Sequence, residues 1–201
     1  VTTIDHKTTK RITNTPQQER NVSFSKDGKT LYYSAERNGH WGIWSATVAD
    51  KDDRLFTYAV KLEEKLVTAP GETCFQPQVS PDGKKIAYLK DRTAIAVMDI
   101  KSGKETIILD KSINYSYTDG DQSFAWSPDS HYILCNYQAD GGWNNEDVAL
   151  IDIETGQITD LTQSGYSDGN FRWALKGKAM TWTSDRNGYR SHGSWGAEND
   201  I

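Results

Sequence analysis

The sequence predicts an all-β chain made of repeated four-stranded antiparallel blades, as in a β-propeller. Three observations point to this fold class. A short turn motif begins at Ser25, Ser80 and Ser127 and returns in altered form at Ala174. Apolar and polar residues alternate on both sides of each copy, which is the period of a strand. The chain also holds 7 Trp, 10 Tyr and 5 Phe beside only 2 Met, and aromatic side chains favour strands. A repeat of roughly 40 to 50 residues made of short strands is typical of propeller blades.

The repeated motif is predicted to be the turn between the first two strands of each blade. Its three clear copies are Ser25-Lys26-Asp27-Gly28, Ser80-Pro81-Asp82-Gly83 and Ser127-Pro128-Asp129-Ser130. In such a turn Pro presets φ, Asp accepts hydrogen bonds from nearby backbone N–H groups, and Gly accepts a positive φ. We therefore assign a structural role in turns to the residues Asp27, Gly28, Asp82, Gly83 and Asp129.

The remaining two strands of each blade enclose a second recurring turn of the form D-x-x-x-G. It reads Asp99 to Gly103 in one repeat and Asp152 to Gly156 in another. The chain then divides into the end of a preceding blade, three complete blades and an incomplete blade: residues 1–19, 20–69, 70–114, 115–164 and 165–201.

The two ends of the chain do not coincide with the ends of a blade. Residues 4–13 match the last turn and last strand of a preceding blade, and the chain stops where the third strand of the fourth repeat should run. The two ends could complete one blade together, or the chain could be an arc of a larger propeller. We expect the arc, because a chain that stops inside a blade leaves an unpaired strand edge.

Composition excludes several classes of function. A net charge of −5 and a pI near 5.4 give no basic surface for nucleic acid. The longest apolar runs are far shorter than the roughly 20 residues of a membrane-spanning helix. Cys74 and Cys135 lack C-x-x-C spacing, so we expect two buried apolar side chains rather than a zinc site or a disulfide scaffold.

The repeat resembles a known family. The S-P-D-G turn, the apolar-x-Tyr strand after it, the S-x-R-N-G turn and the D-x-x-x-G turn are similar to the PD40 repeat of TolB-like and tricorn-like propellers. Three segments more closely resemble the propeller region of bacterial tricorn-like peptidases of the S41 class: residues 119–122, 165–170 and 184–196. No catalytic residue of that family maps onto this chain.

The resemblance implies a noncatalytic propeller segment that binds or gates peptides or proteins. It would belong to a periplasmic or secreted serine peptidase whose other domains lie in a longer chain. A TolB-like periplasmic module that docks proteins is the alternative. Whether the parent protein is an enzyme stays open. An enzyme with its active site at the propeller centre would need convergent His, carboxylate or Arg groups, whereas the first strands offer mostly Ser, Phe, Val and Trp.

The sequence offers little catalytic or metal-binding chemistry. His192-Gly193-Ser194-Trp195-Gly196 has His where a G-x-S-x-G nucleophile elbow needs Gly. Asp119-Gly120-Asp121 holds only a fragment of the oxygen-ligand pattern of a calcium loop, and its residues suit a chain turn. We therefore predict no catalytic residue, no cofactor and no metal in this segment.

Aromatic residues are the best candidates for a binding face. Seven of them fall in loops that a propeller places on one side of the disk: Trp41, Tyr115, Tyr117, Trp143, Tyr166, Tyr189 and Trp195. Tyr and Trp are enriched in binding hot spots, so this face could hold an extended peptide or a partner loop. The alternative is that these side chains pack between adjacent blades. Arg37 and Arg186 recur in equivalent turns, which favours an ion pair or a backbone contact inside the blade.

Overall fold

The computed structural model describes residues 1–50, 52–53, 55–118, 122–138 and 145–187. They form two compact units, Val1–Asp91 with Met98–Lys104 and Arg92–Val97 with Glu105–Ile201. Each unit has its own packed core.

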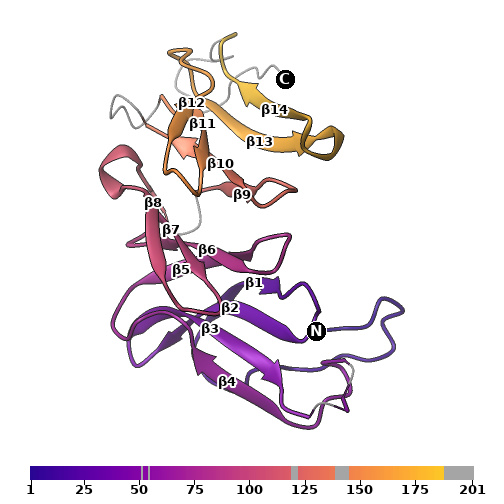
Figure 1. The fold of residues 1–201 in the computed structure, drawn as a ribbon. Coiled ribbons are helices and arrows are strands. Elements are labelled where there is room, and N and C mark those ends of the chain that lie inside the picture. Colours follow the sequence, from indigo (N-terminus) through magenta and orange to yellow (C-terminus); the bar gives the residue numbers. More distant parts are fainter. Residues whose placement is uncertain (51, 54, 119–121, 139–144, 188–201) are drawn as a thin grey trace. The chain divides into compact units, whose positions relative to one another are not determined.

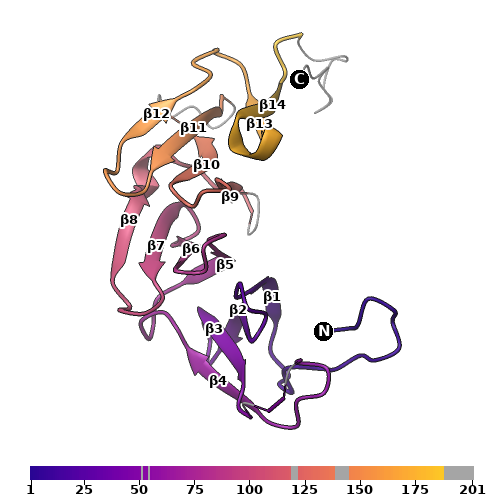
Figure 2. The same ribbon diagram turned by 45° about the vertical axis from the view of Figure 1, so that its right-hand side comes forward.

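The strands form antiparallel sheets in which chain neighbours pair. Figures 1 and 2 show this order across the first sheet, β1-β2-β3-β4. The first sheet consists of β1 (Glu19–Phe24), β2 (Thr30–Arg37), β3 (His40–Val48) and β4 (Leu62–Leu66). The second consists of β5 (Cys74–Val79), β6 (Lys85–Lys90), β7 (Ala94–Asp99) and β8 (Glu105–Leu109).

The third sheet consists of β9 (Phe124–Trp126), β10 (Tyr132–Tyr137), β11 (Asp147–Asp152) and β12 (Ile158–Asp160). In the described residues the fourth sheet has two strands, β13 (Asp168–Ala174) and β14 (Ala179–Ser184). Two short 3₁₀ segments complete the structure, η1 (Lys111–Ile113) and η2 (Leu175–Gly177). The predicted fold class is confirmed: three four-stranded blades and, within the described residues, two strands of a fourth.

The turn after the first strand has the same hydrogen bonds in all three complete blades. In the second blade, Ser80 Oγ donates to Asp82 Oδ1 (2.6 Å) and accepts from the Lys85 N–H (3.0 Å), while Asp82 accepts from the Lys84 N–H (3.0 Å). Gly83 has φ +80°. The turns that begin at Ser25 and Ser127 repeat this pattern. One serine and one aspartate thus fix the turn in each blade.

The turn of the fourth sheet differs because it lacks both residues. Leu175 and Lys176 have φ values of +49° and +58°, followed by Gly177 at +88°. No side chain caps this turn at Ala174. Left-handed backbone costs an L-residue about 1 to 2 kcal/mol, so the degraded motif is the more strained turn.

A β-bulge interrupts the first strand in three of the four sheets. Each bulge contains a non-glycine residue with positive φ, four positions before the turn motif: Asn21, Gln76 and Asn170. In the second blade the freed N–H of Gln76 donates to Ser34 Oγ on the first blade, at 3.0 Å. The bulge thus helps to join two successive blades.

The strand β2 has two buried faces with different neighbours. Tyr32 and Ser34 face the side on which β5 packs, as the bond from Gln76 to Ser34 shows. Leu31 and Tyr33 face the opposite side and belong to a core cluster with Phe56. Phe56 lies in the long segment between β3 and β4, whose Tyr58 and Ala59 N–H groups both donate to the Leu55 carbonyl at 3.1 Å. This insertion therefore folds onto the flank of the first blade.

In the second unit the two-stranded sheet packs on the third blade. Phe171 of β13 joins Leu134 and Val148 in a buried cluster, with Trp173 and Trp182 against it. The indole N–H of Trp173 donates to a backbone carbonyl of β9, at 3.3 Å. Blade-on-blade packing is thus seen directly in this unit.

Candidate functional site

The candidate binding site is a pocket at one end of the first blade. Two segments form it: the turn between β2 and β3 with the first half of β3, and the end of β4 with the connection from β4 to β5. Its volume is about 260 Å³. The lining residues are Arg37, Asn38, His40, Trp41, Gly42, Trp44, Leu66, Ala69, Pro70, Gly71 and Glu72.

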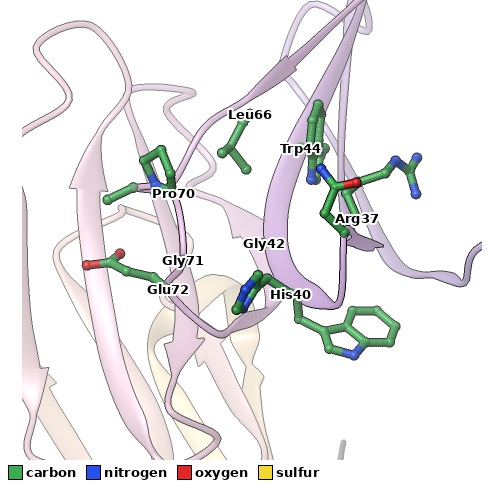
Figure 3. Close-up of a pocket in the computed structure, with 11 residues that line it drawn as sticks. Arg37, His40, Gly42, Trp44, Leu66, Pro70, Gly71 and Glu72 are labelled. Atoms are coloured by element: carbon green, nitrogen blue, oxygen red, sulfur yellow. The ribbon is translucent and has the colours of Figure 1, made fainter.

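The walls of the pocket are mainly apolar. Figure 3 shows Leu66, Pro70 and Trp44 around the cavity. Gly42 lets the β3 backbone come close to the opposite wall, since a Cβ there would lie 2.9 Å from Leu66 Cδ1. A glycine at this position therefore allows the close approach of β3 to Leu66.

The two charged residues of the pocket are both engaged in ion pairs. Arg37 Nη2 lies 2.9 Å from Glu19 Oε1 on β1, and its guanidinium points away from the cavity (Figure 3). Glu72 Oε1 lies 2.7 Å from Lys90 Nζ. The contacts predicted for Arg37 inside the blade, an ion pair or a backbone contact, are both present, since its Nη1 also donates to the Glu36 carbonyl at 3.0 Å. The pocket therefore offers apolar surface to a ligand, and each of its two charged side chains already has a counterion.

Trp41 occupies a position between two blades. Its ring centroid lies 5.4 Å from that of Phe75 on β5, and the Arg20 guanidinium carbon of β1 lies 5.2 Å from the ring. Packing between adjacent blades is the alternative that the sequence analysis gave for the aromatic residues. Trp41 also lines the pocket, so one side chain both joins the blades and bounds the cavity.

The other described candidates lie in the second unit and are exposed to solvent. The exposed fractions of Tyr115, Tyr117 and Tyr166 are 42%, 79% and 46%. Tyr115 and Tyr117 follow η1, and Tyr166 lies in the connection from β12 to β13. Trp143, Tyr189 and Trp195 lie outside the described residues. The shared face of all seven aromatics stays a prediction.

The sequence fragments considered for metal binding and catalysis are not tested by the described residues. In that part of the chain no group of three or more His, Cys, Asp or Glu side chains is placed to hold a metal ion. The segments Asp119 to Asp121 and His192 to Gly196 lie outside it. Among the same described residues no helix is long and apolar enough to cross a membrane.

The two cysteines are both buried, as the sequence predicts. Cys74 and Cys135 have no exposed surface. Burial raises the pKa of the Cys135 thiol far above its usual range, which leaves the protonated form and suppresses thiolate chemistry.

The sequence did not reveal the pocket itself. Its second wall, from Leu66 to Glu72, lies in a connection between blades that the repeat pattern does not cover. Ala69-Pro70-Gly71 shows turn chemistry but no sign of a cavity. The pocket arises only when this connection folds against the β2–β3 turn.

Comparison with known proteins identifies the fold. No protein-family model matches the chain, and no curated protein matches it. Among solved structures, TolB from Acinetobacter baumannii is 23% identical with a TM-score of 0.56, over 82% of this chain and 38% of that one. The tricorn protease is 17% identical with a TM-score of 0.64, over 92% of this chain and 17% of that one.

An oligogalacturonate lyase from Vibrio parahaemolyticus shares the same architecture. It is 19% identical with a TM-score of 0.59, over 80% of this chain and 45% of that one. This chain thus spans less than half the length of each of these three proteins. At such identities the likeness concerns the fold. The chain has the β-propeller blade fold of TolB and the tricorn protease.

Proposed function

We propose that this chain is a noncatalytic propeller segment that binds peptides or proteins, and that the first-blade pocket receives one uncharged side chain. The observation that carries this proposal is the combination of apolar walls with charges that are already paired. A pocket of about 260 Å³ is below the roughly 300 to 1,000 Å³ of small-molecule sites. Its size suits one large side chain of a peptide.

The energetics favour an apolar or aromatic anchor over a charged one. Side chains that fill well-packed pockets contribute most of the binding free energy at protein interfaces. A charged side chain would lose water here and would compete with the existing pairs of Arg37 and Glu72. An aromatic or aliphatic side chain would cover Leu66 and Trp44 without that cost.

The wider role follows from the sequence resemblance and the shared fold. We propose that the segment admits or docks peptides for a tricorn-like serine peptidase of the S41 class, in a periplasmic or secreted protein. A TolB-like periplasmic docking module is the second candidate. Sequence beyond residue 201 would distinguish them, because PDZ and protease segments belong only to the first.

The binding proposal can be tested with peptides that differ in one side chain. A set of Gly-Ser peptides carrying one Phe, Leu, Lys or Glu would be titrated by calorimetry. We expect the Phe and Leu peptides to bind more tightly than the Lys and Glu peptides. Ala69→Trp should fill the pocket and remove this preference, whereas Lys84→Trp, at an exposed turn, should leave it intact.

Two results would contradict the proposal. One is equal affinity for all four peptides, and the other is an unchanged preference in the Ala69→Trp variant. The predicted aromatic face is tested separately with Tyr117→Ala. If Tyr117→Ala loses peptide affinity while Ala69→Trp keeps it, the binding site lies in the second unit instead.

A further inference from the structure

A second pocket lies between the first blade and the turn that joins β7 to β8. Its volume is about 310 Å³, and its walls include Tyr32, Ser45 and Lys65 on the first blade and residues 98 and 100–103 around that turn. All of these residues belong to the first compact unit. The pocket shares no residue with the first-blade pocket, so the two are separate sites.

The polar wall of this pocket is one cross-strand row on the first blade. In the antiparallel register Tyr32 pairs with Ser45, and Ser45 pairs with Lys65, so the three side chains lie on the same face. The third blade fills the equivalent row with two leucines and a threonine: Leu134, Leu150 and Thr159. The blade fold is therefore compatible with apolar packing in this row, and it does not require two hydroxyls and an ammonium group there.

Tyr32 is a buried residue whose hydroxyl is left without a partner. The residue is 7% exposed, and its hydroxyl makes no hydrogen bond to any of the described residues. A buried tyrosine hydroxyl usually has such a partner. Burial, together with the charge of Asp27, raises the pKa of Tyr32, so the hydroxyl stays protonated. The pocket thus presents a hydrogen-bond donor that lacks an acceptor.

The two charged side chains of the pocket are both lysines. Neither Lys65 nor Lys101 forms an ion pair with a carboxylate of the described residues. Two aspartates lie in neighbouring turns, Asp27 and Asp99, but they accept hydrogen bonds inside those turns and do not line the pocket. The charge that the pocket walls present to a ligand is therefore positive.

We propose that this pocket binds a phosphate group, carried by a small phosphate monoester. Two ammonium groups match the charge of about −1.5 to −2 that such a group carries near pH 7. Lysine binds phosphate as a point charge, whereas planar recognition of a carboxylate favours arginine. No arginine is among the described residues that line the pocket. The Tyr32 hydroxyl supplies a donor to a phosphate oxygen.

The remaining wall suits the organic part of such a ligand. Val67, Met98 and Ile100 give apolar surface beside the lysines. The pocket volume of about 310 Å³ is at the lower end of the roughly 300 to 1,000 Å³ of small-molecule sites. A compact monoester therefore fits better than a large ligand.

Titration calorimetry of the full chain with four small probes tests the ligand class. The probes are phenyl phosphate, inorganic phosphate, benzoate and benzyl alcohol, each at low salt. We expect phenyl phosphate to bind about tenfold more tightly than benzoate, because it carries more charge and more acceptor oxygens, and benzyl alcohol not to bind. Inorganic phosphate should bind more weakly than phenyl phosphate, whereas equal affinity would identify the free ion as the source of the phosphate group.

Single substitutions locate the site. Tyr32→Phe removes only the hydroxyl and should weaken phenyl phosphate binding by about tenfold. Lys65→Met or Lys101→Met should weaken it by about three- to fivefold and reduce its dependence on salt. Lys61→Met removes the same charge just before β4, outside the pocket, and is the matched control that should leave the affinity unchanged. Equal urea midpoints show that the variants are folded.

Four outcomes would overturn the proposal. Phenyl phosphate could fail to bind, benzoate or benzyl alcohol could bind as tightly, or Tyr32→Phe could keep full affinity. Lys61→Met could also weaken binding as much as Lys101→Met, which would show attraction to the surface as a whole. The test is independent of the peptide site, because Ala69→Trp changes only the first-blade pocket and should leave phosphate binding intact.

Discussion

Replacing Phe56 by alanine tests whether the insertion between β3 and β4 is part of the first-blade core. Phe56 is 3% exposed and packs with Leu31 and Tyr33. Its ring meets that of Phe24 edge to face, with centroids 5.9 Å apart. Phe→Ala in a core costs about 3 to 5 kcal/mol. We expect about 3 kcal/mol, the lower end, because a surface insertion can partly collapse into the space.

Urea denaturation and thermal unfolding measure this loss. For a chain of about this size 1 kcal/mol corresponds to roughly 2 to 4 °C, so the midpoint should fall by about 6 to 12 °C. Tyr58→Ala, two residues away and 62% exposed, is the matched control and should change stability by no more than about 0.5 kcal/mol. A Phe56→Ala loss no larger than that of the control would refute the reasoning.

Two further predictions concern titration and thiol access. Hydrogen bonds from the turn serine and from backbone N–H groups lower the pKa of Asp27 and Asp129. Burial raises the pKa of Asp82, but the same kinds of hydrogen bond outweigh it and leave that pKa lowered. Because these pKa values lie below those of the unfolded chain, about 3.9, the contribution is complete above that pH and is lost as pH falls through the folded values. Urea midpoints should therefore drop below about pH 4, and a flat profile from pH 5 to 2.5 would contradict this. Cys74 and Cys135 should not react with a thiol reagent until guanidinium unfolds the chain, when two thiols per chain should be titrated.

The sequence was sufficient to predict the blades because the residues that form each turn lie close together in the chain. The hydrogen bonds of Ser80 and Asp82 in this turn all lie within the six residues 80–85. The motif therefore specifies its turn without help from the rest of the fold. The D-x-x-x-G turn is equally local, since Asp152 accepts from the N–H groups of Glu154 and Thr155 at 2.9 and 3.0 Å.

Features that depend on tertiary packing could not be predicted in this way. The bulges at Asn21, Gln76 and Asn170 could not be placed from residue type: Asn favours positive φ, but Gln76 adopts it as well, and a bulge is defined only against the neighbouring strand. Phe56 lies in an insertion outside the repeat pattern, and its burial depends on Leu31 and Tyr33 of β2, which are distant in the sequence. The binding pocket also needs two connections to meet.

Restoring the turn motif in the fourth sheet would test whether its two residues govern turn stability. The change is Ala174→Ser together with Lys176→Asp, which recreates the Ser and Asp of the other three turns. Each intact turn has two hydrogen bonds from backbone N–H groups to these side chains, at 2.9 to 3.1 Å. A net contribution of about 0.5 to 1.5 kcal/mol for each predicts a gain of about 1 to 3 kcal/mol.

The single variants separate this mechanism from a general effect of polar residues. Serine alone lacks its carboxylate acceptor, and aspartate alone lacks the hydroxyl that holds it over the turn. Each single change should therefore give less than half of the gain, and a double-mutant cycle should show favourable coupling. Hydrogen exchange of β13 and β14 and the urea midpoint measure it. If the double variant is no more stable than the sum of the two single variants, the serine and aspartate act independently, and the paired geometry of the other three turns is not what stabilises them.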